Sequence, residues 1–386
     1  MLIIHANIHT MAGETIKNGC VRTIDGVITE ISSELLKPDS GEEVIDAKGY
    51  DLYPGFIDAH THLGMWEDGL TFEGDDGNED TDPITPQLRA IDAINPLDHC
   101  FSEALAAGVT TVVTGPGSAN PIGGQLAAIK TYGRCIDDML VKAPVAMKMA
   151  LGENPKSVYH GKNLAPVTRM GTASLIREQL FKTQRYLDEL DRAKTDEDFD
   201  APEFDIKCES LVPVLKGEVE VHFHAHRADD IFTAVRIAKE FHLNYVIIHG
   251  TEGHLIAEEL KKENARVLSG PFLCDRSKPE LKNLTPACPG VLAKNGVLTA
   301  IITDHPVVPL QYLPTCAGLA VREGMNPEDA LRAITINPAK ICGIDNRIGS
   351  IEVGKDADLL LFSENPLAMT AKPKMVFALG KLVHES

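Results

Sequence analysis

The chain has 386 residues, of which 44% are hydrophobic and 24% are charged. This composition is that of a globular protein and excludes a disordered, collagenous or coiled-coil chain. The length allows one barrel of about 250 residues together with a smaller accessory domain. The formal net charge of −19 would repel nucleic acid and anionic membranes, so we expect neither as a partner.

The sequence carries no signal for export or for a membrane. No apolar run reaches the roughly 18–20 residues that a membrane span needs, and the first residues lack the basic and apolar regions of a secretory signal. Eight cysteines are scattered without a CxxC pair, which is typical of reduced thiols and not of a disulfide framework or a zinc ribbon. We therefore expect a cytoplasmic protein of enzyme size that acts on a small-molecule substrate.

Short strands are predicted at both ends of the chain. Partly alternating apolar residues at 2–10 and 26–31 indicate strands near the N-terminus. The C-terminal residues have the same texture, with an apolar run at 359–362. We expect the two terminal pieces, 1–53 and 347–386, to assemble into one small composite β-sandwich domain.

The residues between these pieces, 54–346, alternate strand-like and helix-like stretches, as βα units around a parallel sheet do. The predicted strands are 55–62, 109–114, 145–151, 219–224, 245–249, 266–269 and 298–303. The predicted helices are 97–107, 174–193, 231–241, 254–263 and 327–333. Seven strands are visible where a (β/α)8 barrel needs eight, and the stretch 155–216 either hides the eighth or lacks it. We predict an α/β fold with a TIM-like (β/α)8 barrel.

Polar side chains follow several of these strands at the point where each strand ends. His60 and His62 close the first strand, and residues two apart on a strand point to the same side. This pair alone is weak evidence, because a chain with 14 histidines contains about half such a pair by chance. His224, His249 and Asp304 close three later strands. Because all strands of a parallel barrel end on one face, we expect the five groups to meet there.

Four histidines and one carboxylate form a nitrogen and oxygen site suited to zinc or a similar divalent ion. A single strand-end histidine is more simply a surface or core residue, but packing does not require five polar strand ends in one barrel. A divalent ion lowers the pKa of bound water to about 7, and a nearby carboxylate can pass the released proton to a leaving amine. We therefore predict a metal-dependent hydrolase in which Asp304 carries the proton.

The motifs together resemble the amidohydrolase superfamily, whose members include imidazolonepropionase and N-acetylglucosamine-6-phosphate deacetylase. The motifs that carry this resemblance are PGFIDAHTH at 54–62, AGVTTV at 107–112, Thr303-Asp304, NPAK at 337–340 and IGSIEVGKDADL at 348–359. The resemblance runs along the whole chain and implies a metal-bearing (β/α)8 barrel beside a composite β-sandwich. It also implies that His60 and His62 bind the more buried metal position, that His224 and His249 bind that ion or a second one, and that Asp304 contacts metal and takes a proton from the attacking water.

The resemblance leaves one ligand open. Members that hold two ions use an additional carboxylated lysine or glutamate from the third or fourth strand. Lys148 and Glu153 are the candidates here, and their odd spacing prevents a regular strand from pointing both inward. Glu153 is preferred, because it follows the end of the strand and deacetylase-type relatives place a glutamate similarly. Lys148 remains an alternative for this ligand. The sequence also leaves open whether one or two ions bind and whether the chain forms a homo-oligomer, as is common among relatives.

Three further residues are candidates for contact with substrate. His226 and Arg227 lie just after the strand that ends at His224, and Arg169 is a possible clamp for an anionic group. The simpler interpretations are an ordinary loop histidine and a surface arginine that caps the helix at 174–193.

The reaction that these residues favour is hydrolysis of a C–N bond other than an ordinary peptide bond, in a linear amide, a cyclic amide or an amidine. The fold alone does not exclude lactones, phosphate esters or X-Pro dipeptides on the same site. A third interpretation is a non-catalytic scaffold like the dihydropyrimidinase-related proteins, which keep the fold but have lost ligands. The presence of all five groups argues against it.

Overall fold

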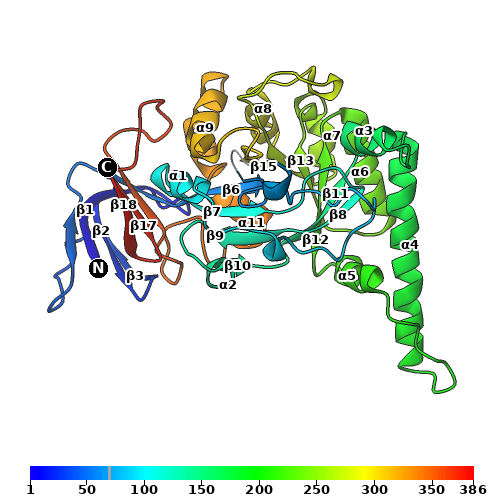
Figure 1. Ribbon diagram of the computed structural model, residues 1–386. Helices are drawn as coiled ribbons and strands as arrows, with labels where there is room; N and C mark the ends of the chain where they lie inside the picture. Colours follow the sequence, from blue (N-terminus) through cyan, green and yellow to red (C-terminus); the bar gives the residue numbers. More distant parts are fainter. Residues whose placement is uncertain (68–70) are drawn as a thin grey trace.

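The computed structural model describes residues 1–67 and 71–386. It is an α/β structure with three sheets of eight, four and six strands. The two chain ends lie in one lobe, and the strands and helices of the middle of the chain form the remainder (Figure 1). Within the described ranges, no helix is both long enough and apolar enough to cross a membrane.

The eight-stranded sheet is built from both ends of the chain. Its strands are β1 (Leu2–Ile8), β2 (Ile16–Ile24), β3 (Val27–Ser32), β4 (Val44–Asp46), β5 (Asp51–Pro54), β16 (Leu359–Phe362), β17 (Met375–Ala378) and β18 (Lys381–Glu385). They are arranged in the order β18-β17-β16-β5-β1-β2-β3, with β4 beside β1. β16 pairs antiparallel with β5, with Leu360 opposite Tyr53, so residues from the two ends complete one sheet.

The two other sheets contain all seven strands predicted for the middle of the chain. Their strands are β6 (Phe56–Thr61), β7 (Val109–Thr114), β8 (Ile122–Gln125), β9 (Ala127–Lys130), β10 (Leu140–Lys142), β11 (Ala146–Ala150), β12 (Glu220–Ala225), β13 (Tyr245–His249), β14 (Arg266–Ser269) and β15 (Leu298–Ile301). The orders are β10-β9-β7-β6 and β15-β14-β13-β12-β11-β8. β6 and β7 are parallel, as are all neighbours from β11 to β15.

No eighth strand lies in the stretch 155–216, all of which is described and which contains helices only. The segment 122–130 fills the gap between β7 and β11 instead, because β9 pairs antiparallel with β7 and β8 pairs antiparallel with β11. On the other side, Ala333 O accepts from Ile301 N at 2.9 Å and Ile334 O accepts from Ile57 N at 2.8 Å, which joins β15 to β6. The bridging segment is short, glycine-containing and antiparallel, so it lacks the βα pattern that marked the other strands.

Helices cover the outer faces of these sheets. They are α1 (Cys100–Ala106), α2 (Ile136–Met139), α3 (Glu153–Gly161), α4 (Arg169–Ala193), α5 (Ile206–Leu215), α6 (Ala228–Glu240), α7 (Ala257–Lys262), α8 (Cys288–Lys294), α9 (Leu313–Arg322), α10 (Pro327–Arg332) and α11 (Ile336–Ile341). The five predicted helices correspond to α1, α4, α6, α7 and α10. α4 has 25 residues and extends beyond the rest of the molecule at one end (Figure 1).

The alternation of side chains along β11 and β12 decides which residues can reach the interior. Met149 and Phe223 pack with apolar residues of α4 and α6 in one buried cluster. Each such side chain contributes roughly 1.5–3 kcal/mol by its burial. Because neighbouring residues on a strand point to opposite faces, Lys148 and His224 face away from these helices.

A buried ion cluster joins the four-stranded sheet to the segment that leads into β16. The ammonium of Lys130, on β9, lies 2.8 Å from Asp356 Oδ2 and 2.5 Å from Asp358 Oδ2. The second oxygen of Asp358 accepts from Leu379 N at 3.0 Å. Lys130 therefore pairs with both carboxylates, of which Asp358 is buried and Asp356 also pairs with Arg347 at 2.9 Å.

We expect Lys130→Met to lower the free energy of unfolding by about 3–5 kcal/mol, because it leaves the buried carboxylate of Asp358 without its counter-charge. Urea denaturation measures this change. Lys381→Met, at an exposed position of β18, is the matched control and should stay within about 0.5 kcal/mol of wild type. Equal stability of the two variants would show that the cluster does not hold the sheets together.

Candidate metal centre

A cavity of about 250 Å³ lies where the parallel strands end. Its polar lining includes residues from five strands or their ends: His60, His62, Lys148, His224, His226, His249 and Asp304. The six lysine and histidine side chains of this set are buried. All five groups predicted at the strand ends are thus brought together.

Asp304 lies between the two histidines of β6. Its Oδ1 is 3.3 Å from His60 Nε2 and 3.4 Å from His62 Nε2. The ring of His249 lies 5.8 Å from that of His60 and 4.6 Å from that of His224, centroid to centroid. Residues separated by up to 244 positions in the sequence therefore share one small space.

The backbone turns sharply at two of these residues. By strand alternation His249 would point with Ile247 toward the covering helices, but its left-handed conformation, with φ 72°, interrupts the alternation. Asp304 also has a positive φ, 55°. Non-glycine residues in this region are uncommon and concentrate at functional sites.

Two of the histidines are oriented by backbone carbonyls. His62 Nδ1 lies 2.7 Å from Gly115 O, and His249 Nδ1 lies 2.8 Å from Gly270 O. A carbonyl oxygen only accepts hydrogen bonds, so each Nδ1 carries the proton. The lone pair of each ring is then on Nε2, which is the arrangement that metal-ligating histidines adopt.

Both carbonyls belong to glycines that have no room for a side chain. A Cβ at Gly270 would lie 2.2 Å from Ile302 O, and one at Gly115 would lie 2.2 Å from Leu126 Cδ2. Gly270 also has φ 143°, a conformation that other residues rarely adopt. The close approach of β14 and β15 therefore determines where the His249 ring can point.

The donor set fits a divalent cation. His224, His226 and His249 offer ligand atoms within 4.8 Å of one another, and so do His60, His249 and Asp304. In the described structure, Nδ1 of His60 and Nδ1 of His224 are buried without a hydrogen-bond partner. A buried imidazole nitrogen without a partner is costly, which indicates that an ion or an ordered water belongs in this space.

Burial sets the charge of these groups. Desolvation holds the pKa of His60, His224 and His226 well below its ordinary value and lowers the pKa of His249 to about 4. Burial acts to raise the pKa of Asp304, but the surrounding His249 and His60 hold it well below its ordinary value. The site thus combines neutral imidazoles, which can coordinate a cation, with an ionised carboxylate.

Lys148 lines the cavity and Glu153 does not, so the geometry does not support the preference for Glu153 as the additional ligand. Lys148 Nζ is 3.3 Å from His60 Nε2, and burial lowers the pKa of this lysine to about 8. β11 ends at Ala150, and the chain turns at Gly152 (φ 87°) into α3. Glu153, the first residue of α3, therefore lines an outer pocket of about 400 Å³ instead.

Of the three predicted substrate-contact residues, only His226 reaches the cavity. Its ring stacks on that of His249 at 4.3 Å, and its Nδ1 lies 2.7 Å from Thr251 Oγ1. His226, in the loop after β12, therefore lines the cavity together with His224 of that strand.

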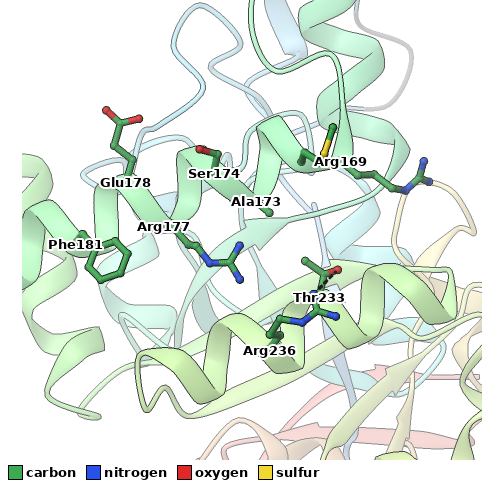
Figure 2. A pocket seen from close by; sticks show the side chains of 9 residues that line it. Arg169, Ala173, Ser174, Arg177, Glu178, Phe181, Thr233 and Arg236 are labelled. Carbon is green, nitrogen blue, oxygen red and sulfur yellow. Dashed lines mark hydrogen bonds between the residues drawn. The ribbon is translucent and has the colours of Figure 1, made fainter.

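The two predicted arginines pair with acidic residues of α6 outside the cavity. Arg227 contacts Asp229 at 2.8 Å, and Arg169 contacts Asp230 at 2.9 Å. Both line the outer pocket. Figure 2 shows Arg169 at one end of a surface groove between α4 and α6. Their pairing with carboxylates of the next helix gives these side chains a structural role.

Other lining residues lie outside the strands, in loops or at the start of α3, and were not found from the sequence. Trp66 packs its ring against His62 at 4.3 Å, and Asn154 and Lys278 line the cavity and contact each other at 2.7 Å. Strand alternation cannot predict loop residues, so no signal of that kind pointed to them.

Comparisons with known proteins show the family of the chain. The profile described as "Amidohydrolase family" matches residues 214–383. A crystal structure of an amidohydrolase from Thermotoga maritima is 42% identical, with a TM-score of 0.96 and 100% of both chains covered. Amidohydrolase tasK of Hapsidospora irregularis is 31% identical over 92% of this chain, which spans only 39% of that protein. An imidazolonepropionase of Phocaeicola vulgatus is 26% identical, covering 95% of this chain and 93% of that protein.

We expect Lys148→Met to lose most of the bound zinc, because Lys148 lies beside His60, whereas Glu153→Gln should keep the wild-type zinc content. Elemental analysis of protein purified with zinc measures both. Loss of zinc from the Glu153 variant, with retention in the Lys148 variant, would reverse the assignment.

We expect Gly270→Ala to weaken zinc binding about 10–100-fold, because a methyl group against Ile302 O must displace the carbonyl that orients His249. Competition with a fluorescent chelator measures the affinity. Gly161→Ala is the control, since a Cβ there meets nothing within 4 Å. Wild-type affinity in the Gly270 variant would contradict the orienting role of its carbonyl.

Proposed function

Because the chain belongs to the amidohydrolase family, we propose that it is a metal-dependent hydrolase of a C–N bond other than an ordinary peptide bond. The bond would belong to a small linear amide, cyclic amide or amidine. The observation that carries the proposal is the position of Asp304 Oδ1, within 3.4 Å of both His60 Nε2 and His62 Nε2 in a buried cavity.

We also infer that the central strands close into a (β/α)8 barrel, with residues 54–346 as the barrel and 1–53 and 347–386 as the accessory domain. Support comes from the backbone hydrogen bonds that cross both gaps between the two central sheets. A closed barrel would bring the C-terminal ends of all parallel strands to one rim, where the histidines and Asp304 are found.

The residues of the cavity fit one or two ions, zinc or another divalent metal. His60 and His62 would hold one ion, and His224 and His249 would hold the same ion or a second one. A divalent ion in this place supplies Lewis acidity, which polarises an amide carbonyl and makes water nucleophilic near neutral pH.

Lys148 is the candidate for a ligand shared by two ions. Its buried amine, with a pKa of about 8, is partly deprotonated at neutral pH and can add to CO2. The nitrogen forms a bond to carbon and loses a proton, and the product is a carbamate with two oxygen donors. Depletion and return of bicarbonate would test this step by its effect on zinc stoichiometry.

Asp304 would carry the proton during hydrolysis. Its carboxylate is ionised and lies beside Nε2 of His60 and of His62, so it is placed to accept a proton from a water molecule bound between these groups. It would then pass this proton to the nitrogen that leaves, which turns a poor leaving group into an amine or ammonia.

We expect prolonged chelation to abolish amine or ammonia release from a panel of amides and cyclic amides, and zinc to restore it, because the ion provides the Lewis acid. Asp304→Asn should lower kcat at least 100-fold while zinc stays bound, and His60→Ala should lose both zinc and activity. A coupled ammonia assay and an amine-reactive dye measure turnover.

A panel of lactones and phosphate esters is the control for the bond class. Turnover confined to that panel would contradict C–N hydrolysis, and turnover that survives complete removal of metal would contradict the metal requirement.

A further inference from the structure

One wall of the metal cavity is a chain of hydrogen bonds among residues of loops and of the first turn of α3. Lys278 Nζ donates to Asn154 Oδ1 and contacts Glu280 Oε1, both at 2.7 Å. Asn154 Nδ2 donates to Ser118 Oγ at 2.6 Å and lies 3.5 Å from His224 Nε2. The wall therefore combines residues that follow β7, β11 and β14, and it abuts the histidine cluster.

Two hydrogen-bond donors on this wall are left for a ligand. A lysine ammonium has three N–H donors; Lys278 donates one to Asn154 and also forms an ion pair with Glu280, so at least one N–H is left. The hydroxyl of Ser118 accepts from Asn154, and within residues 1–67 and 71–386 its own hydrogen finds no acceptor. The side-chain amide of Asn154 accepts from Lys278 through its oxygen and donates to Ser118 through its nitrogen. Lys278 and Ser118 therefore lie on either side of this amide.

Glu280 anchors Lys278 from behind. Its side chain is fully buried, and its second oxygen accepts from Glu153 N at 3.0 Å. The side chain of Lys278 stays 26% exposed and lines the cavity, so the ammonium, and not the carboxylate behind it, faces an incoming molecule. Asp275 also lines the cavity, but it is exposed, and water screens its charge.

Apolar groups form other parts of the lining: Trp66, Pro271, Leu281 and Val307. They can cover the hydrocarbon part of a small ligand without competing for its polar atoms. A ligand that suits the whole cavity thus has an apolar body and a compact group that accepts two hydrogen bonds, one of them from a cation.

We propose that Lys278 and Ser118 form an anion-binding subsite and that the substrate carries a carboxylate close to the C–N bond that is broken. The position of the bond rests on the proposed function, whereas the recognition of the carboxylate rests on this wall alone. Charge-assisted hydrogen bonds are about twice as strong as neutral ones, so the subsite discriminates a carboxylate from a carboxamide of the same shape.

The test compares N-acetyl-L-leucine with N-acetyl-L-leucinamide on the zinc-loaded protein by isothermal titration; kcat/KM replaces Kd for a probe that is hydrolysed. Wild type should prefer the carboxylate at least 10-fold. The double variant Lys278→Gln with Glu280→Gln, which leaves no unpaired buried carboxylate, should reduce that preference to less than 3-fold. Lys282→Gln, at an exposed site on the same loop, should keep it.

Ser118→Ala removes no charge and should itself lower the preference about 3-fold, which keeps the proposal testable where the double variant fails to fold. Zinc content and circular dichroism identify such a failure. No preference in wild type, or a preference that survives both the double variant and Ser118→Ala, would overturn the subsite, because the carboxylate would then bind to the metal or elsewhere.

The two proposals fail in different ways. A carboxylate preference that depends on Lys278, in a protein that hydrolyses no amide, contradicts only the hydrolase function. Amide hydrolysis without such a preference contradicts only the subsite.

Discussion

The metal centre depends on one constraint, which is that neutral imidazole nitrogens must point at a common space from strands far apart in the sequence. Burial keeps the rings neutral, and the carbonyls of Gly115 and Gly270 determine which nitrogen carries the proton. These carbonyls are in place only because neighbouring strands approach too closely for any side chain at the two glycines. Backbone packing therefore decides which nitrogen of His62 and of His249 can coordinate a cation. The ionised carboxylate of Asp304 would balance part of the positive charge of that cation.

Much of this centre could be predicted from the sequence, because regular strands have a fixed alternation. His60, His62, His224, His249 and Asp304 each follow an apolar run, and parallel strands end on the same edge. The alternation of side chains along β11 also indicates which residue is the better candidate for the additional ligand. Lys148 pairs in register with His222 and shares the face of His224, whereas Glu153 lies beyond the end of the strand. The resemblance to deacetylases outweighed that signal and favoured Glu153, which lies outside the cavity.

The features that could not be predicted lie in irregular parts of the structure. A single sequence shows no periodic pattern of apolar residues there from which side-chain directions could be inferred. The bridging segment 122–130 is antiparallel and contains two adjacent glycines, so it did not have the appearance of a barrel strand. Arg169 and Arg227 find their acidic partners on α6, a contact set by tertiary packing. Lys278 reaches the cavity from a loop more than a hundred residues from its partner Asn154.

The terminal sheet has a consequence for synthesis of the chain. β5 is made early and is flanked in the finished sheet by β1 and β16, so one of its edges lacks a partner until residues 359–362 leave the ribosome. The carboxylates that neutralise Lys130 are made just before β16 and arrive equally late. An exposed strand edge invites pairing with another chain. The nascent protein thus passes through a long interval in which one edge of β5 is unpaired, and this interval lasts until β16 has been made.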